Sequence, residues 1–145
     1  MGIRRKAREF ALQILYILEL NPGNSDEISK LFLKDQKAKG DVRGFAELIV
    51  EGTLEKKGEI DRMIKQLVRN WDMKRISLID RNIIRMGAYE IIFLSQSLQD
   101  SIPLAVTINE AVEIAKKYST PDSGKFVNGV LEQIHKEYIK GKKNE

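Results

Sequence analysis

The sequence predicts an all-α protein, a compact bundle of about seven helices. Apolar residues recur every three or four positions along most of the 145-residue chain, which is the spacing that buries one face of a helix. No stretch alternates regularly between apolar and polar residues, as a half-buried strand would. The three prolines, Pro22, Pro103 and Pro121, fall between the helical patterns, where each can mark the end of a helix.

The first helix is expected over Ile3–Leu20, because the apolar residues of this segment share one face. It ends at Asn21-Pro22-Gly23-Asn24, a run of strong helix breakers. A shorter helix follows, for which Ser25 and Asp26 are the candidate caps.

The next part of the chain predicts a loop and two further helices. The stretch Lys37–Gly44 is polar and is expected to be the loop. Helical spacing of apolar residues then returns over Phe45–Gly52 and again over Ile60–Val68. A weak break near Gly58 separates these two helices, because glycine is a poor helix former.

The most hydrophobic run, Ile79–Leu94, is apolar on more than one side and predicts a central helix with neighbours around it. Ser77 and Asp80 form a relaxed capping box at its start. Gly87 lies in the middle of this helix, at a cost of about 1 kcal/mol relative to alanine. We therefore expect another backbone to pass close to Gly87.

Two helices follow the central one. Thr107-Ile108-Asn109-Glu110 has the pattern of a capping box, so a helix is expected to open at Thr107. Tyr118–Gly124 is expected to be a break, since it is rich in small and polar residues. The last helix carries apolar residues at helical spacing from Phe126 to Tyr138.

The composition excludes several classes of protein. Apolar residues make up 42% of the chain and charged residues 32%, which is typical of a globular domain with a core. The chain has no cysteine and one histidine, so disulfides and thiolate metal sites are excluded. No apolar run is long enough to span a membrane, and no secretory signal is recognisable. We expect an intracellular, cytoplasmic protein without a metal or a cofactor.

Positive charge is concentrated at the amino terminus. The chain has 25 Lys and Arg against 21 Asp and Glu, and four residues account for the whole excess: Arg4, Arg5, Lys6 and Arg8. Either a solvated helix start or a bound polyanion would explain this cluster. Each exposed positive charge at a helix amino terminus destabilises the helix by about 0.3–1 kcal/mol, because it interacts unfavourably with the helix dipole. The stability of the protein therefore gives no reason to place these charges there.

One stripe of the first helix combines charge with an aromatic ring. Arg5, Arg8, Leu12 and Tyr16 are spaced by three or four residues, and we expect this stripe to lie beside the apolar face. Guanidinium groups with a neighbouring ring can hold phosphates and stack on a base. The stripe is therefore a candidate nucleic-acid contact.

No catalytic site is predicted. A Gly-rich phosphate loop, a nucleophile elbow and paired metal ligands are all missing from the sequence, and Tyr118–Lys125 lacks the spacing of a phosphate loop. His135 is expected at the surface without a catalytic partner. Asp80, Arg81 and Arg85 are expected to be ordinary helix-surface charges unless a partner covers them. The residues alone thus indicate a helical, non-enzymatic, anion-binding domain.

Three segments resemble the NusB family of bacterial transcription antitermination proteins. The first, RRKAREFALQILY at residues 4–16, is similar to the family's opening signature RRxARExAxQxLY. The second is INEAVEIAK at residues 108–116, followed by KFVNGVL at 125–131. The third, DRNIIRMGAYE at residues 80–90, is similar to the family's central helix. The resemblance covers nearly the whole chain, although residues 21–75 carry little of it.

The resemblance implies a fold and a function. It implies two small helical subdomains, which we place at residues 1–75 and 76–140, with a frayed tail at 141–145. It implies a transcription antitermination factor that binds single-stranded boxA RNA together with the small-subunit ribosomal protein that acts as NusE. That complex joins transcribing RNA polymerase, notably on ribosomal RNA operons. Some family members self-associate, so a homodimer stays open.

The resemblance also assigns site residues. The residues that match the family's arginine-rich RNA motif are Arg4, Arg5, Lys6 and Arg8, with Lys6 where many relatives have a third arginine. The residues that match the loop and helix start completing the RNA surface are Asp122, Ser123, Gly124, Lys125 and Phe126. The residues that match positions near the partner-binding surface are Tyr16, Asp80 and Arg81. Phe126 lies at the edge of the apolar stripe, so a core role and a base-stacking role are both open.

Two other functions remain as alternatives. The same helical fold occurs as the amino-terminal domain of certain RNA cytosine methyltransferases, which need a downstream cofactor domain. We expect no such domain here, because the chain ends at Glu145. The other alternative is a protein-only scaffold with a solvated basic end. Such a scaffold would bind its partner equally well after Arg5 and Arg8 were replaced, and it would not retain RNA.

Overall fold

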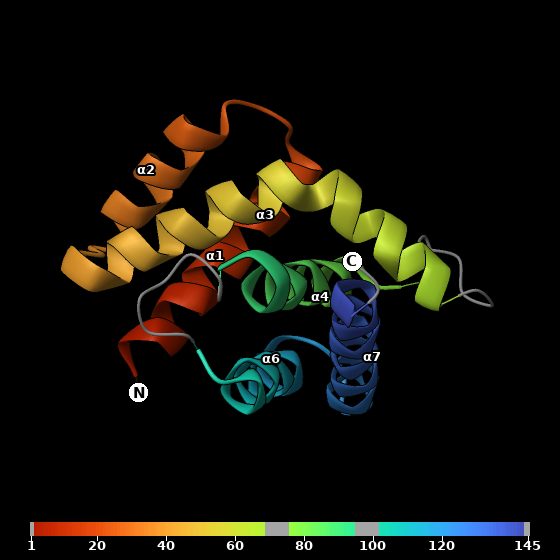
Figure 1. Ribbon diagram of the computed structural model, residues 1–145. Coiled ribbons are helices and arrows are strands. Elements are labelled where there is room, and N and C mark those ends of the chain that lie inside the picture. The colour runs from red at the N-terminus through yellow and green to blue at the C-terminus, as the bar shows by residue number, and fades with distance from the viewer. Residues whose placement is uncertain (1, 69–75, 95–101, 144–145) are drawn as a thin grey trace. The chain divides into compact units, whose positions relative to one another are not determined.

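The computed structural model describes residues 2–68, 76–94 and 102–143, and these residues form helices without any strand (Figure 1). The elements, in chain order, are α1 (Ile3–Leu20), α2 (Ser25–Asp35), α3 (Gly40–Leu67), α4 (Leu78–Tyr89), the π-helical segment η2 (Glu90–Leu94), α6 (Leu104–Tyr118) and α7 (Ser123–Lys143). The predicted all-α class is confirmed. The described part of the chain has six α-helices instead of about seven, because α3 is continuous where two helices were expected. None of these helices is long and apolar enough to cross a membrane.

The chain divides into two compact units, Met1–Glu55 and Lys56–Glu145. The division falls inside α3, so this helix contributes its first half to one unit and its second half to the other. The subdomain boundary expected at residue 75 lies outside the described residues, which omit 69–75.

In the first unit, α1 has the bounds that its periodicity predicted, and it ends where the Asn21 N–H donates to the Ile17 carbonyl at 2.8 Å. The expected cap of α2 is wrong. Asn24 caps this helix, since its side-chain oxygen accepts from the Glu27 N–H at 3.0 Å. The rings of Phe10 on α1 and Phe32 on α2 meet edge to face, with centroids 5.9 Å apart.

Two predictions about the region of helix α3 are wrong, the extent of the loop before it and the break near Gly58. The helix begins at Gly40, so the predicted loop is shorter than Lys37–Gly44. It also runs through Gly58 without a break. The local preference of one glycine against the helix is about 1 kcal/mol. Burial of apolar residues on both sides of it, including Ile49 and Ile60, outweighs that preference.

In the second unit, α4 packs against both α6 and α7, which also pack against each other (Figure 1). The predicted cap is confirmed, because the Ser77 hydroxyl accepts from the Asp80 N–H at 3.1 Å. The central position is also confirmed: every residue from Asn82 to Tyr89 is buried. This arrangement leaves no exposed face on most of α4.

Arg85 is buried inside this unit, so the expectation of a surface charge is wrong. Its guanidinium donates to both carboxylate oxygens of Asp61 on α3, at 2.8 and 3.0 Å, and to the Asn82 side-chain oxygen at 3.3 Å. A bidentate pair of this kind compensates the cost of burying the charge. The pair joins α4 to the second half of α3 within this unit.

The capping box expected at Thr107 is also wrong. Helix α6 begins three residues earlier, at Leu104, and Thr107 is buried within its first turns. Pro103 precedes the helix with a φ of −58°, which suits a helix start and needs no N–H partner. The break between α6 and α7 is confirmed at residues 119–122.

Gly87 lies against a side chain, where we expected a neighbouring backbone. A Cβ atom added at Gly87 would be 2.8 and 2.9 Å from the two methyl carbons of Leu131 on α7. Leu131 is fully buried, so its side chain has little room to move. The glycine therefore sets how closely α4 and α7 approach each other.

Replacing Gly87 with alanine is expected to destabilise the protein by about 1–3 kcal/mol through overpacking, although alanine is the better helix former. Urea denaturation measures the change in the free energy of unfolding. Gly58→Ala is the matched control, since a Cβ there touches nothing within 4 Å, and it should stabilise by about 0.4–1 kcal/mol. A Gly87→Ala protein as stable as the control would contradict the packing argument.

Candidate nucleic-acid interface

The start of α1 holds two arginines on one aromatic ring. Arg4 and Arg8 are one helical turn apart, and their guanidinium carbons lie 5.1 and 5.3 Å from the centroid of the Phe45 ring on α3. Contacts of this type contribute about 0.5–1 kcal/mol each when exposed and more when water is excluded. The ring thus fixes the positions of both positive groups.

The four basic residues of the cluster differ in how accessible they are. Arg4 and Lys6 are exposed and Arg5 is half-buried, whereas Arg8 is only 3% exposed. The expectation that Arg8 lies outside the apolar face is wrong, and Leu12, one turn further along the stripe, is buried as well. The guanidinium group of Arg8 lies over the Phe45 ring, and the residues next to Arg8 on α1 are buried as well.

The first turn of α1 adds to the positive potential of this end. It contains no acidic residue, and Gly2 offers no side chain to cap the free backbone N–H groups. The ammonium group of Lys6 lies 5.0 Å from the Phe10 ring centroid. Further along α1, Tyr16 is 38% exposed, so its ring is accessible. The exposed part of the helix start can accept an anion.

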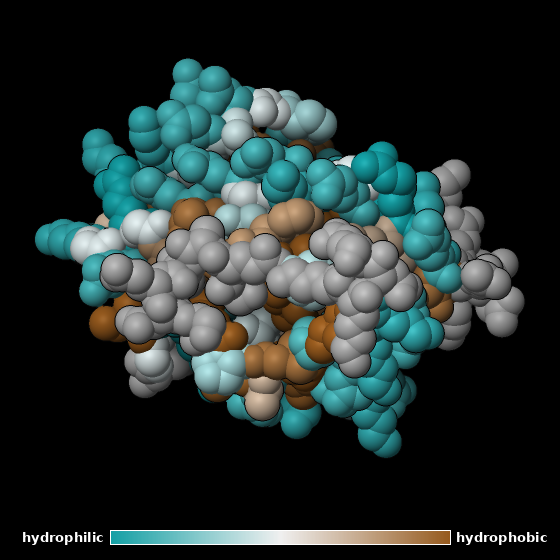
Figure 2. Space-filling view, in the orientation of Figure 1, coloured by the Kyte–Doolittle hydropathy of each residue, from teal (hydrophilic) through white to brown (hydrophobic). Residues whose placement is uncertain are grey.

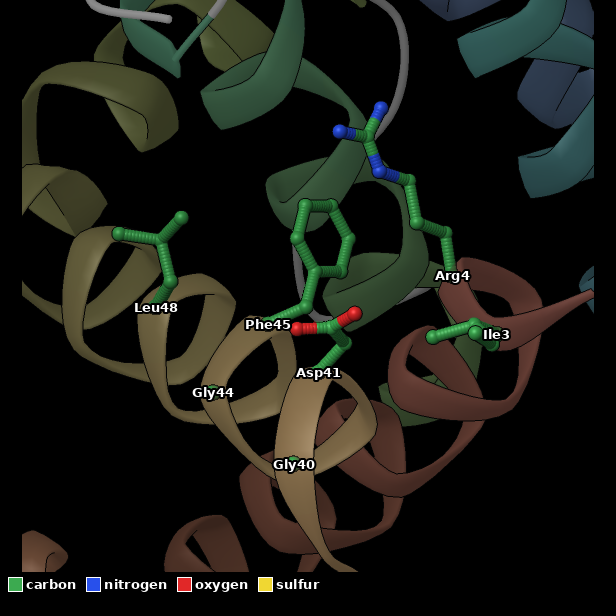
Figure 3. Close-up of a pocket in the computed structure, with 7 residues that line it drawn as sticks. All are labelled: Ile3, Arg4, Gly40, Asp41, Gly44, Phe45 and Leu48. Atoms are coloured by element: carbon green, nitrogen blue, oxygen red, sulfur yellow. The ribbon is translucent and has the colours of Figure 1, made fainter.

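A pocket of about 520 Å³ lies beside Arg4, between α1 and α3 (Figure 3). Its lining residues are Ile3, Arg4, Gly40, Asp41, Gly44, Phe45 and Leu48. Sequence reasoning missed the contributions of Asp41, assigned to a loop, and of Phe45, assigned only to a helix face. Their spacing of four residues would have placed both on one face of a helix that begins before Asp41.

The second candidate set lies in the second unit, where the loop after α6 meets the start of α7. The Ser123 hydroxyl donates to a carboxylate oxygen of Asp80 on α4 at 2.9 Å. It also lies 2.9 Å from the hydroxyls of Ser119 and Thr120. Ser123 is 4% exposed and Asp80 is 8% exposed. The structure therefore joins two residues that were expected on different surfaces, and it uses them to tie α7 to α4.

The neighbours of Ser123 line a second pocket, of about 610 Å³, on α6 and α7. Gly124 lies at its wall, where an added Cβ would be 3.4 Å from the side chains of Lys116 and Val112. Lys125 lines the same pocket and is exposed. Asp122 is exposed as well. Hydrophobic residues reach the surface over α6 (Figure 2).

The remaining assigned residues are partly accessible. Phe126 is half-buried, so part of this residue faces the core and part is exposed. Arg81 is half-buried too, and its Nε atom has no hydrogen-bond partner among the residues that the structure describes. Within the same residues, no cluster of three or more His, Cys, Asp or Glu side chains could hold a metal ion.

Comparison with known proteins adds a family and a fold. The chain matches the NusB family over residues 5–136. The transcription antitermination protein NusB of Thermodesulfovibrio yellowstonii is 42% identical over 146 aligned positions, which cover 94% of this chain and 93% of that protein. The NusB protein of Elusimicrobium minutum is 41% identical and covers 97% of this chain and 99% of its own length. These relatives are named as antitermination proteins, which confirms the prediction of a protein without enzymatic activity.

Two solved structures are also similar. The solution structure of NusB from Aquifex aeolicus has a TM-score of 0.81 at 32% identity, with 97% of this chain and 93% of that chain covered. A crystal structure of the antitermination factors NusB and NusE in complex with dsRNA also has a TM-score of 0.81 at 32% identity. It covers 95% of this chain and 99% of that one.

Replacing Ser123 with alanine is expected to destabilise the protein by about 1–3 kcal/mol, because it leaves the buried Asp80 carboxylate without its hydrogen bond. Urea denaturation gives the size of the effect. Ser119→Ala is the control, since it removes one hydroxyl of the same cluster and keeps the hydrogen bond between Ser123 and Asp80. Equal destabilisation of the two variants would show that the hydrogen bond to Asp80 has no special role.

Proposed function

Because the chain belongs to the NusB family, we propose that it is a transcription antitermination factor that binds boxA RNA together with the ribosomal protein that acts as NusE. In this proposal the complex joins transcribing RNA polymerase in the cytoplasm, notably on ribosomal RNA operons. The observation that carries the RNA-binding part is the basic start of α1, where Phe45 holds Arg4 and Arg8 in place.

The accessible cations of α1 are the proposed phosphate ligands. Arg4 and Lys6 are exposed and Arg5 is half-buried, so each can approach an RNA backbone. A guanidinium group can donate two parallel hydrogen bonds to the oxygens of one phosphate. Such a contact fixes the orientation of the phosphate and also neutralises its charge. Arg8 is buried, so its proposed role is to contact the Phe45 ring from below the surface.

Single-stranded RNA is the form that these side chains suit. Arginine planes and aromatic rings stack on unpaired bases, whose hydrogen-bonding edges are also free for recognition. Phe45 is half-buried and lies next to an exposed arginine, so it offers such a stacking surface. Base-paired RNA would present mainly its phosphates and 2′-hydroxyls to the same cluster.

The start of α7 is proposed to complete the RNA surface, with a division of roles among its residues. Asp122 and Lys125 are exposed and can touch RNA, and Phe126 keeps part of its surface accessible. Ser123 and Gly124 are buried, so they position the loop and do not contact the ligand. In the same way, we assign the partner contacts to Tyr16 and Arg81, while Asp80 holds the start of α4.

Fluorescence anisotropy with a labelled boxA RNA and a scrambled control tests the proposal. The titration is carried out at two salt concentrations, with and without the ribosomal partner. We expect tighter binding to boxA RNA, strengthened by the partner. Equal binding of both RNAs, indifferent to the partner, would reduce the basic start to a nonspecific polyanion site. Binding that rises less steeply with protein concentration than a one-site isotherm would indicate a homodimer that covers the RNA surface.

Replacing both Arg4 and Lys6 with glutamine is expected to weaken RNA binding and to reduce the slope of log K against log salt by about 1.4, roughly 0.7 for each phosphate that is no longer neutralised. The same titration at several salt concentrations measures the slope. The control removes two exposed lysines of α7, as Lys136→Gln with Lys140→Gln, which changes the net charge equally. If this control lowers the slope as much, the effect is due to net charge and the α1 surface is not the binding site.

A further inference from the structure

We propose that the pocket beside Arg4 binds one RNA base and prefers guanine, an inference that rests on the RNA-binding function proposed above. The pocket belongs to the first unit alone and is formed by α1 and the first turns of α3. It adjoins the basic cluster, so an RNA strand whose phosphates contact Arg4 or Lys6 has its bases within reach of it.

Two opposite charges line this pocket without pairing with each other. Arg4 contacts the Phe45 ring, and Asp41 is exposed in the first turn of α3. Neither side chain makes a hydrogen bond or an ion pair with any residue that the structure describes. Figure 3 shows the guanidinium group and the carboxylate at opposite ends of the Phe45 ring. A ligand with acceptors on one edge and donors on another would satisfy both groups at once.

The pocket has the size and the walls that a planar base requires. Its volume of about 520 Å³ falls within the usual range of small-ligand pockets, about 300–1,000 Å³. Phe45 and the partly exposed Leu48 provide apolar surface. Gly40 and Gly44 leave the floor open, since a Cβ atom on either would touch nothing within 4 Å. Gly40 also has a φ of +55°, which a residue with a side chain rarely adopts.

The carboxylate makes a base a better occupant than a phosphate. Asp41 would repel a phosphate in the pocket, whereas it can accept hydrogen bonds from the N–H groups of a base. The exposed Lys6, which does not line the pocket, remains available for the backbone. Contacts with the phosphates would hold the strand, and the contact with the base edge would supply the sequence preference.

Among the four bases, guanine fits the two charges best. Its N1–H and N2–H groups lie side by side and can donate together to the two oxygens of one carboxylate, while its O6 and N7 accept from arginine. Adenine and cytosine present one amino group next to a ring acceptor, and uracil presents one N–H between two carbonyls. Each of these places a lone pair against an oxygen of Asp41, which costs binding free energy.

The experiment measures base preference with short RNAs and the full chain. Uridine heptamers carry guanine, adenine, cytosine, uracil or hypoxanthine at the central position, and anisotropy gives each dissociation constant. The guanine heptamer should bind at least about fivefold more tightly than the adenine, cytosine and uracil ones. Hypoxanthine, which lacks the N2 amino group, should bind with intermediate affinity. Asp41→Asn should abolish these differences and leave the affinity for the all-uridine heptamer the same or higher.

Two further variants distinguish a loss of the pocket from a change in net charge and from a loss of folding. Asp35→Asn, at the exposed end of α2, changes the net charge equally and should keep the guanine preference. Gly44→Leu should fill the pocket and remove the preference while the melting temperature stays the same or rises, because the added side chain meets no neighbour at its Cβ.

The possible results distinguish the pocket from the RNA-binding function as a whole. A protein that binds all five heptamers equally overturns the guanine pocket and leaves the RNA-binding proposal standing. A guanine preference that survives Asp41→Asn and Gly44→Leu overturns the assignment to this pocket. A protein that binds none of the heptamers and no boxA RNA, even with the ribosomal partner present, overturns both proposals.

Discussion

The contact of Arg4 and Arg8 with Phe45 is the interaction on which the proposed RNA surface depends. Like charges one helical turn apart destabilise a helix by about 0.2–0.5 kcal/mol, and each exposed cation at a helix amino terminus adds about 0.3–1 kcal/mol. Two cation–π contacts of about 0.5–1 kcal/mol each are of the size needed to offset these terms. The aromatic ring on α3 therefore lets α1 begin with concentrated charge, and it positions that charge before any ligand binds.

In the second unit, buried polar contacts fix the positions of the helices relative to α4. The Arg85 guanidinium pairs with Asp61 on α3, and the Ser123 hydroxyl bonds Asp80 at the start of α4. A buried polar group without its partner is costly, so each pair favours one register of the helices over its neighbours. Gly87 acts on the same packing through shape, because only the missing Cβ leaves room for Leu131. Charge, hydrogen bonding and volume thus define how α4 meets the helices around it.

The sequence predicted those features that depend on nearby residues and missed those that depend on distant ones. The bounds of α1 and the Ser77 cap were correct, because a strong apolar period and a short-range hydrogen bond decide them. The break at Gly58 was wrong because burial of distant residues outweighs local helix preference. Arg8 looked accessible for a related reason: it is buried in the folded chain, where it contacts Phe45 of another helix. The meeting of Arg4 with Asp41 in one pocket is likewise a tertiary fact that no local pattern contains.

A family motif does not by itself separate residues that touch a ligand from residues that hold those contacts in place, and burial supplies that separation. Arg8 and Ser123 both belong to segments that resemble the family's RNA motif, yet both are buried. The neighbours Arg4 and Lys125 are exposed on the same segments. Since a buried side chain can reach RNA only after the structure opens, its replacement should change stability and binding together. An exposed side chain can change binding alone, which makes the ratio of the two effects a measure of each residue's role.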